Sequence, residues 1–505
     1  VTNWESDAED LMGETGGKVK FDQSKYMLTG ILVENHDAGE LPGIVIQNNY
    51  VHDVNGYMSQ NGSEGHKKGS GGIMVLVTGG TTESYFKDLQ ITGNKVEKVC
   101  HEAIYMESCG AARVLVGGKD SQQAGDKKWV GWPNVSVTHN YVNDVAGDGI
   151  VLINADGGIA EYNLVTKSAS EEWNYSRNPA HAAIWMWDCN NVTMQHNEAA
   201  YTTSTQDGMA FDCDYGNQNV MYQYNYSHDN KGGFWMACPG PYYTVNSVVR
   251  YNVSVNDGLF DGSRIMRVGE RGSIGHQVYN NTIYWDHKYK VNAVEQGSWG
   301  TPPTSGTDIY NNIFCGNTQE FVNNDGIHYA NNCVWGGAEN AYPFDEDVNA
   351  VVADPGFVDV ANRTDGSFAN GKVTLGSVAG MELKQNSPCI DAGKNLMAVP
   401  EESLDTVKDE LVKTHITLEN KDYKGNAVPH TGTKKVDIGA FEYQGAGNYQ
   451  PAPVKTDKTY LQALYQQADG YKEADFTASS WANMISAKEA AKKILDNASA
   501  IQKAV

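Results

Sequence analysis

The stretch VTMQHN, residues 192–197, returns along the chain as VMYQYN at 220–225, VVRYN at 248–252, HQVYNN at 276–281 and TDIYNN at 307–312. Each copy is a short run of β-branched or aromatic residues that closes on Asn. From Asn197 to Asn332 the gaps between the closing Asn residues are 28, 27, 29, 31 and 20 residues. Repeats of this length indicate a fold in which each unit stacks only on its neighbours. We therefore predict a right-handed parallel β-helix with one coil per repeat.

Earlier copies end at Asn49, Asn94, Asn140 and Asn163. A recurring Asn suits a coil corner, because its short amide tolerates a left-handed backbone and can hydrogen-bond its counterpart about 4.8 Å away in the next coil. Wider gaps before Asn94, Asn140 and Asn197 predict inserted loops that wall a groove on one face, near residues 56–72, 117–132 and 167–181. The alternative, a β-sandwich, predicts no fixed phase between an Asn and the strand that follows it.

The chain divides by composition into four parts. Residues 1–345 predict the β-helix catalytic domain, 346–445 closing rungs or a β cap, 446–456 a polar linker, and 457–505 a small helical module. Apolar residues at helical spacing, together with Ser480 as the N-cap of the second helix, predict a short hairpin in that module. The expected fold is all-β with this C-terminal helical hairpin.

Composition excludes several functions. The chain has 505 residues with 38 Lys+Arg and 62 Asp+Glu, a net charge of −24. Nucleic-acid affinity depends on Lys and Arg, so we expect no nucleic-acid partner, and acidic polysaccharides are disfavoured for the same reason. No apolar run approaches the ~20 residues of a membrane span.

The start of the chain and its cysteines bear on processing. The start at Val1 has neither Met nor a signal-peptide core, so we expect a mature or trimmed chain. The eight Cys lack metal-site spacing and are read as small buried side chains, with one or two disulfides as the alternative in an exported protein.

Candidate chemistry lies on the strands that follow the Asn corners, IWMWDC (184–189), MAFDCD (209–214) and FWMAC (234–238). Aligning their apolar positions predicts that Trp185 and Trp187 face inward. It also predicts an outward cluster in which Asp188 and Asp212 are neighbours and Asp214 is close by. Asp207 would join them through a bend at Gly208. Clustered carboxylates raise one another's pKa, which keeps one of them protonated as a general acid.

A glycosidase needs such an acid together with a second carboxylate that attacks the sugar or activates water. An outward-facing Trp235 and the neighbouring Tyr215 would stack on the sugar, since ring faces pack against the apolar face of a pyranoside. Four side chains are candidate hydrogen-bond partners of the sugar: His181, His228, Arg264 and Arg267. The alternatives for the carboxylates are a solvated cluster and a calcium site.

The sequence resembles lacto-N-biosidases of glycoside hydrolase family 136 in three features. These are the order of the Asn-anchored coils, the segment DGMAFDCDYGN (207–217) and the C-terminal motifs SPCIDAG…VDIGAFEY (387–443). The resemblance implies Asp207 as acid/base and Asp214 as nucleophile of a retaining mechanism, with Tyr215 lining the pocket. It implies release of lacto-N-biose from lacto-N-tetraose outside the cell or at the bacterial surface. It also implies a companion subunit supplying an N-terminal region, and structural Ca²⁺ although the chemistry itself requires no cofactor.

From the residues we assign Asp212 and Asp188 the role of tuning the catalytic pair. Carboxyl groups of Asp207 and Asp214 about 5–5.5 Å apart would mean retention, and about 6.5–9.5 Å inversion. Two other functions stay open. A polysaccharide lyase could draw a base from Arg264, Arg267 or Arg271, although the net charge repels acidic chains. A non-catalytic adhesin would bind glycans without cleaving them.

Overall fold

A computed structural model describes residues 4–5, 29–55, 71–110, 129–170, 180–238, 244–268, 273–297, 306–324, 326–395, 418–429 and 435–445, and, toward the C-terminus, 462, 465–466, 468–469, 471–473 and 478–496. The chain divides into two compact units. The first comprises residues 1–423 and 427–443, and the second comprises 424–426 and 444–505. The loops predicted to wall the groove lie largely outside the described residues.

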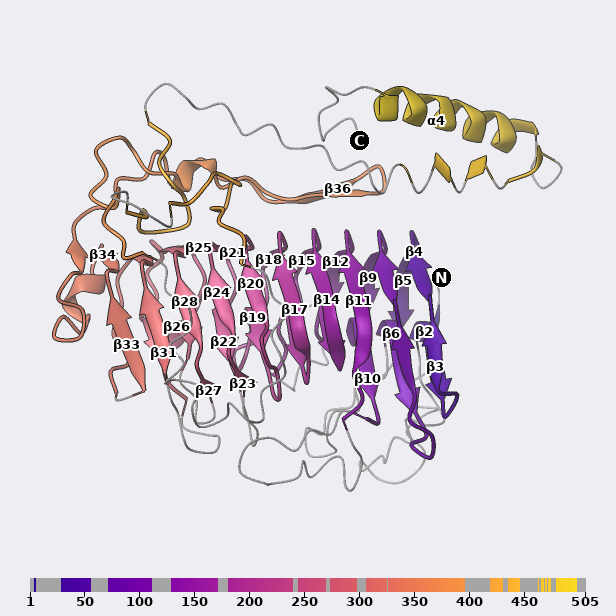
Figure 1. The fold of residues 1–505 in the computed structure, drawn as a ribbon, viewed down its shortest axis with the longest axis horizontal. Coiled ribbons are helices and arrows are strands. Elements are labelled where there is room, and N and C mark those ends of the chain that lie inside the picture. The colour runs from indigo at the N-terminus through magenta and orange to yellow at the C-terminus, as the bar shows by residue number, and fades with distance from the viewer. Residues whose placement is uncertain are drawn as a thin grey trace. The chain divides into compact units, whose positions relative to one another are not determined.

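Three long sheets of parallel strands form the walls of the β-helix in the first unit (Figure 1). Sheet I, which follows the Asn corners, contains β1 (Trp4–Glu5), β5 (Tyr50–Asn55), β9 (Lys95–Val99), β12 (Tyr141–Val145), β15 (Leu164–Thr166), β18 (Glu198–Ala200), β21 (Tyr226–His228), β25 (Val253–Val255), β29 (Thr282–Tyr284), β32 (Ile313–Cys315), β34 (Cys333–Trp335) and β35 (Val351–Val352). Sheet II contains β2 (Thr29–His36), β6 (Gly71–Thr78), β10 (Glu102–Ser108), β13 (Ile150–Ile153), β16 (Ile184–Trp187), β19 (Met209–Cys213), β22 (Gly233–Ala237), β26 (Ser263–Arg267) and β30 (Val291–Glu295).

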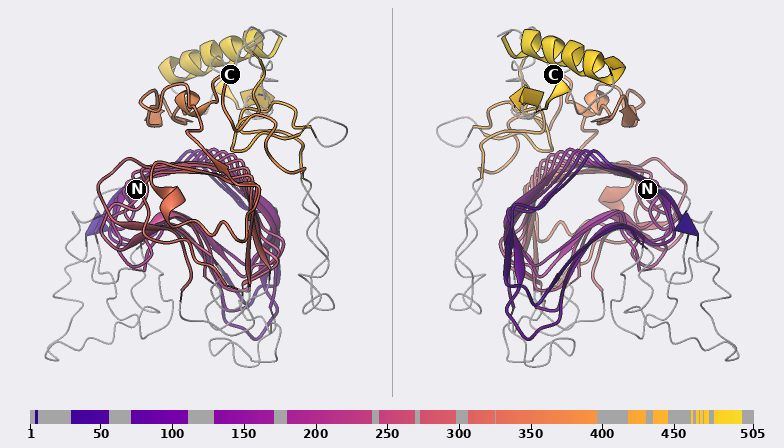
Figure 2. Two further views of the ribbon diagram at one scale, coloured as in Figure 1. Left: turned by 90° about the vertical axis from the view of Figure 1, so that its left-hand side faces the viewer. Right: turned by 90° about the vertical axis from the view of Figure 1, so that its right-hand side faces the viewer.

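Sheet III precedes the Asn corners and contains β4 (Val45–Gln47), β8 (Gln90–Thr92), β11 (Trp132–Thr138), β14 (Ala155–Glu161), β17 (Asn190–Gln195), β20 (Met221–Gln223), β24 (Val248–Arg250), β28 (Gln277–Tyr279), β31 (Thr307–Tyr310) and β33 (Ile327–Ala330). Short pairs are β3 (Glu40–Pro42) with β7 (Tyr85–Lys87), β23 (Thr244–Val245) with β27 (Ser273–Ile274), and the antiparallel hairpin β36 (Ser367–Ala369) with β37 (Lys372–Thr374). The coils superimpose in the views along the stack (Figure 2). The predicted all-β fold, a parallel β-helix, is confirmed.

The closing Asn residues form one continuous ladder from Asn49 to Asn332. In each step the amide Nδ2 donates to the Oδ1 atom of the next Asn, as from Asn197 to Asn225 at 3.0 Å, and the backbone N–H donates to the same oxygen at 2.9 Å. The ladder ends where the backbone N–H of Asn332 donates to the carboxylate of Asp347 at 2.9 Å. Buried amides are stabilised only when their polar atoms are paired, and this ladder pairs them coil after coil.

The left-handed backbone at the corner belongs to the residue before the ladder Asn. His196, Tyr224 and Tyr251 have φ values of 48°, 57° and 49°. Their rings stack along the corner, with centroids 5.1 Å apart between His196 and Tyr224. The prediction that the Asn itself takes this conformation is therefore wrong. The amide serves as the hydrogen-bonding element of the corner.

Residues 346–445 add one further strand to the coils, β35, which pairs with β34, and they also contain the β36–β37 hairpin. Beyond it, the segment includes the 3-10 turn η2 (Ala379–Met381), which follows η1 (Ala338–Asn340) of the last coil. Its apolar side chains pack with those on one face of sheet I, and this cluster includes Phe357, Leu383 and Phe441 beside Tyr226 and Val253. The segment therefore covers the side of the coil stack.

The second unit contains the helix α4 (Ala478–Asp496), which begins before Ser480, so the predicted N-cap is wrong. Most of the first predicted helix lies outside the described residues. Within this unit Lys488 forms an ion pair with Asp469. Among the residues that the structure describes, no helix is both long and apolar enough to cross a membrane. Seven of the eight cysteines are buried, as expected for small core side chains.

Candidate active site

The register of sheet II decides which side chains of β19 reach the outer surface. Phe211 pairs with Ile184 on one side and with Trp235 on the other. Trp235 is fully buried, and its ring lies 6.0 Å from Tyr222 and 6.2 Å from His276 across the interior. Because side chains alternate along a strand, Phe211 faces the interior and Asp212 faces outward. This orientation of Asp212 agrees with the prediction.

Three carboxylates gather around this position. Asp207 precedes Gly208, whose φ of 60° makes the expected bend. Asp214 follows β19, and its N–H donates to the carbonyl of Met186 at 3.0 Å. Burial raises the pKa of Asp212 well above its usual range, and the charges of Asp214 and Asp207 raise it further. The site therefore crowds three carboxyl groups together, and burial and the neighbouring charges disfavour ionisation of Asp212.

Two arginines border the carboxylates. Arg264 is 7% exposed and donates a hydrogen bond to the carbonyl of Gln206, next to Asp207. Burial and the charge of Arg267 lower the pKa of Arg264, while Glu295, Asp207 and Asp212 oppose that shift. Arg267 lies 3.5 Å from Glu295. The structure thus places both Arg264 and Arg267, two of the candidates from the sequence, near the carboxylates.

The aromatic platform differs from the predicted one. Trp185 pairs with Asp212, so Trp185 and Trp187 share its outer face. Trp187 packs edge-on against Tyr215 with ring centroids 5.7 Å apart. The predictions that Trp185 and Trp187 face inward and that Trp235 faces outward are wrong, because the register places Ile184, Phe211 and Trp235 in one inward row, which differs from the apolar alignment. Burial and then the charge of Asp214 raise the pKa of Tyr215, so its phenol stays a hydrogen-bond donor.

Asp188 does not lie beside Asp212, so that prediction is wrong. Its backbone N–H donates to the carbonyl of Tyr215 at 2.7 Å, in the turn beyond β16. The Asp188 residue has a φ of 50° and is 3% exposed. A Cβ atom at Gly216 would lie 1.8 Å from its Oδ1 atom. Asp188 therefore belongs to the tightly packed turn that follows the strand.

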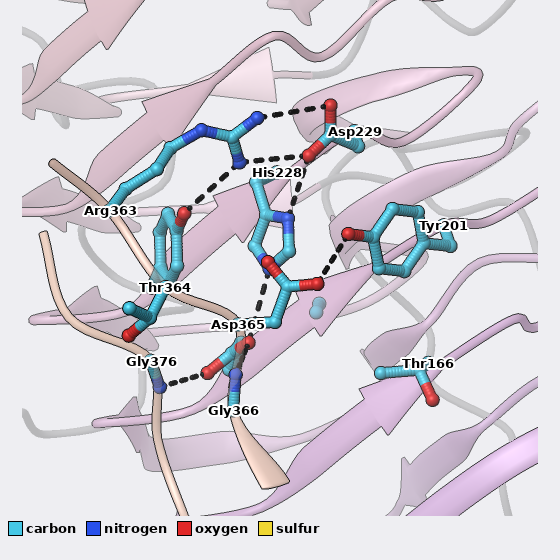
Figure 3. Close-up of polar contacts among 12 residues, drawn as sticks. Thr166, Tyr201, His228, Asp229, Arg363, Thr364, Asp365, Gly366 and Gly376 are labelled. Carbon is cyan, nitrogen blue, oxygen red and sulfur yellow. Dashed lines mark hydrogen bonds and ion pairs between the residues drawn. The ribbon is translucent and has the colours of Figure 1, made fainter. Parts of the chain in front are cut away.

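His228 lies on β21 of sheet I, apart from the carboxylates on sheet II. Its Nε2 atom is 3.1 Å from Glu198 and its Nδ1 atom 2.9 Å from Asp229. Glu198 also accepts the N–H groups of Gly366 and Gly376, which flank the β36–β37 hairpin (Figure 3). His228 is fully buried with both ring nitrogens engaged. The prediction that it contacts substrate at the Asp cluster is wrong, and its visible role is to hold this hairpin.

His181 precedes β16, one coil before Asp207. Its carbonyl accepts the N–H of Gly208 at 2.8 Å. Its Nδ1 atom lies 3.3 Å from Asp148, a residue whose charge also contributes to the raised pKa of Asp212. Glu102 completes a buried group with these two residues. Both acidic members were missed in the sequence, although Glu102 and Asp148 stand at the same position of successive coils, two residues before the paired Ile104 and Ile150, and His181 stands one residue earlier in the next coil.

Comparison with known proteins gives one relative by sequence. A lacto-N-biosidase from Bifidobacterium longum subsp. longum is 27% identical over 472 residues, which cover 86% of this chain and 27% of that protein. The chain is similar to a lacto-N-biosidase. The predicted resemblance is thereby confirmed, and the chain spans about a quarter of the length of this relative. No family model matches the sequence.

Solved structures give more distant matches. A lacto-N-biosidase of glycoside hydrolase family 136 from Eubacterium ramulus aligns with a TM-score of 0.42 at 23% identity, over 56% of this chain and 46% of that one. The pectate lyase Pel9A aligns with a TM-score of 0.35 at 14% identity, over 79% and 97%. Likeness this remote does not carry function, which must be argued from the site.

Proposed function

We propose that this chain is a glycoside hydrolase that releases lacto-N-biose from lacto-N-tetraose-like oligosaccharides. The observation that carries the proposal is the outward carboxylate group of Asp207, Asp212 and Asp214 beside Trp187 and Tyr215. A glycosidase needs paired carboxyl groups and a surface that positions the sugar. The sequence similarity to a lacto-N-biosidase supports this substrate class.

The proposed reaction has two steps. Asp214 attacks the anomeric carbon while Asp207 donates its proton to the departing glycosidic oxygen, which breaks the bond and forms a glycosyl-enzyme. Asp207, now ionised, then takes a proton from water, whose oxygen displaces Asp214 and gives a product of retained configuration. Burial and the charges of Asp214 and Asp207 raise the pKa of Asp212, which disfavours a further negative charge at the site. Trp187 and Tyr215 hold the sugar ring.

The resemblance to lacto-N-biosidases also suggests where the protein acts and with which partner. We propose that the protein acts outside the cell or at the bacterial surface and that a companion subunit supplies an N-terminal region. A structural Ca²⁺ ion remains a prediction. The lyase alternative is less favoured because Arg267 lies beside Glu295 and Arg264 donates to a backbone carbonyl. The third arginine considered for that role, Arg271, lies outside the described residues.

The test is hydrolysis of a lacto-N-biosyl aryl glycoside by the full chain. Asp207→Asn and Asp214→Asn should each lower kcat/KM by orders of magnitude while the melting temperature stays near that of the wild type. Asp345→Asn, at an exposed position, is the matched control and should keep full activity. Near-normal turnover in either of the first two variants would refute the assignment. The proposed substrate is β-linked, so proton NMR of the first-formed sugar should show the β-anomer, and the α-anomer would contradict the retaining mechanism.

A further inference from the structure

A second polar site lies on the three coils before Asp207. The register pairs Ile104 with Ile150 and Ile150 with Ile184. Glu102 therefore stands beside Asp148, and Asp148 beside Ala182, which follows His181. The three side chains are at most 1% exposed. One ligand atom from each lies within 4.8 Å of the other two, the only such group among the described residues.

Each carboxylate is held by one oxygen and presents the other to an imidazole. Glu102 accepts the N–H of Asp148 at 2.8 Å, and Asp148 accepts the N–H of Ala182 at 2.6 Å through Oδ1. The Oδ2 atom of Asp148 lies 3.3 Å from His181 Nδ1, and the Oε1 atom of Glu102 lies 3.3 Å from His101 Nε2. Backbone donors that orient ligating oxygens are the usual outer shell of a metal site.

The imidazole of His181 is the second observation that points to a ligand. It is 1% exposed, and its Nε2 atom has no hydrogen-bond partner among the described residues. Its Nδ1 atom meets Asp148 at 3.3 Å, longer than the about 2.7–2.9 Å of a charge-assisted hydrogen bond. Two ligands bound to a tetrahedral zinc ion at about 2.0–2.1 Å lie about 3.3 Å apart. The separation therefore matches the edge of a zinc coordination tetrahedron in which Nδ1 is the ligand atom of His181.

We propose that Glu102, Asp148 and His181 bind a divalent transition-metal ion, Zn²⁺ by preference. Two carboxylate oxygens and one imidazole nitrogen form a mixed donor set that Zn²⁺ accepts, with a fourth position left for water. Ca²⁺ takes six to eight oxygen ligands and suits this set poorly. The calcium expected from the resemblance is therefore not the ion that these residues fit. This inference does not depend on the proposed function.

The cluster around His228 shows why this arrangement is distinctive. It also contains one histidine and two acidic residues, but the two ring nitrogens contact different carboxylates, Glu198 and Asp229. Glu198 already accepts two backbone N–H groups from the hairpin (Figure 3). No common point is left there for a cation. His228 is therefore a natural control for a buried histidine beside two carboxylates.

The position of the site also suggests what the ion does. His181 precedes β16, and its carbonyl holds the N–H of Gly208, the residue after Asp207. A metal that joins three coils through Glu102, Asp148 and His181 fixes this backbone. We assign the ion a positioning role, since none of its three ligands is among the residues assigned to the reaction.

The experiment measures metal binding directly. The full chain is stripped with a chelator and titrated with Zn²⁺, Co²⁺ or Ca²⁺ alone by calorimetry, and its metal content after dialysis is measured by mass spectrometry. We expect about one equivalent of Zn²⁺ per chain and a bound Co²⁺ whose visible absorption reports four-coordinate nitrogen and oxygen ligands. The wild type thus tests the proposal without any variant. If it retains no Zn²⁺ or Co²⁺, or binds Ca²⁺ more tightly than Zn²⁺ at this site, the proposal is overturned.

Variants then locate the ion. His181→Gln and Glu102→Gln should weaken Zn²⁺ binding by at least about tenfold and remove the rise in melting temperature that Zn²⁺ gives to the wild type. His228→Gln and the exposed His328→Gln should bind Zn²⁺ like the wild type. Unchanged binding in folded His181→Gln would show that the ion sits elsewhere and would overturn the assignment. If that variant does not fold, the Co²⁺ spectrum of the wild type decides, and a spectrum of oxygen ligands alone would count against His181.

Discussion

Asn225 in the middle of the ladder offers a quantitative test of the fold. Its Oδ1 atom accepts the N–H and the Nδ2 group of Asn197 at 2.9 and 3.0 Å, and its own Nδ2 donates to Met194 and Asn252 at 2.9 and 3.0 Å. Replacement by Ala leaves two buried donors on Asn197 without their acceptor. At about 1–3 kcal/mol for each orphaned group, the free energy of unfolding should fall by about 2–6 kcal/mol.

The assay is thermal unfolding of wild type, Asn225→Ala and the control Asn349→Ala. Asn349 is exposed and outside the ladder, so its replacement should leave the melting temperature within error of the wild type. Hydrogen exchange adds a local readout, because the amide proton of Asn197 should lose its protection in Asn225→Ala. If Asn225→Ala melts with the control and the Asn197 amide stays protected, the ladder does not stabilise the coils and the reasoning is refuted.

Three further predictions concern single side chains. Burial, then repulsion from Asp437, raises the pKa of Glu442 from 4.5 to about 9, so the folded chain keeps a proton that the unfolded chain releases. Stability should fall as pH rises from 4.5 to 9, by about 3 kcal/mol at pH 7, and Glu442→Gln should flatten this dependence in denaturant titrations. Although burial opposes its charge, hydrogen bonds with Asp229 and Glu198 raise the pKa of His228 from 6.5 to about 9. The stability that protonated His228 contributes should be complete below pH 6.5 and lost as the pH rises toward 9. His228→Gln should therefore lack this fall in melting temperature between pH 6.5 and 9, and a variant that still shows it would contradict the prediction. Trp187→Ala should raise KM about tenfold with a smaller effect on kcat, since stacking is worth about 0.5–1.5 kcal/mol, and Trp187→Phe should restore most of the affinity in steady-state assays.

The coil architecture was predictable because its signal is periodic. The ladder Asn residues recur where each coil turns, so their spacing indicated both the fold and the phase of each strand. The left-handed corner residues were predictable only in part, because Asn280, Asn311 and Asn331 are of a type that favours that backbone whereas Tyr224 and Tyr251 are not. The Asn ladder and the tertiary stacking of the rings impose it.

The sequence predicted which way the site side chains point within one coil, but not which residues of neighbouring coils lie side by side. The alternation along β19 placed Asp212 outside, and Gly208 marked the bend that brings Asp207 to it. Between coils the pairing of one strand with the next is not fixed by the apolar pattern, because β16 and β19 are buried at every position and their apolar residues fit more than one register. For this reason Trp185 was assigned to the wrong face, and Asp188 to the wrong neighbour.

The central claim is that the outer carboxylates of β19 and its flanking turns cleave a glycosidic bond. Chromatography of the products formed from lacto-N-tetraose by the full chain tests it most directly. We predict lacto-N-biose and lactose in equal amounts, with neither formed by Asp214→Asn. Intact tetrasaccharide after prolonged incubation with the wild-type chain, or the same products from Asp214→Asn at the wild-type rate, would contradict the account.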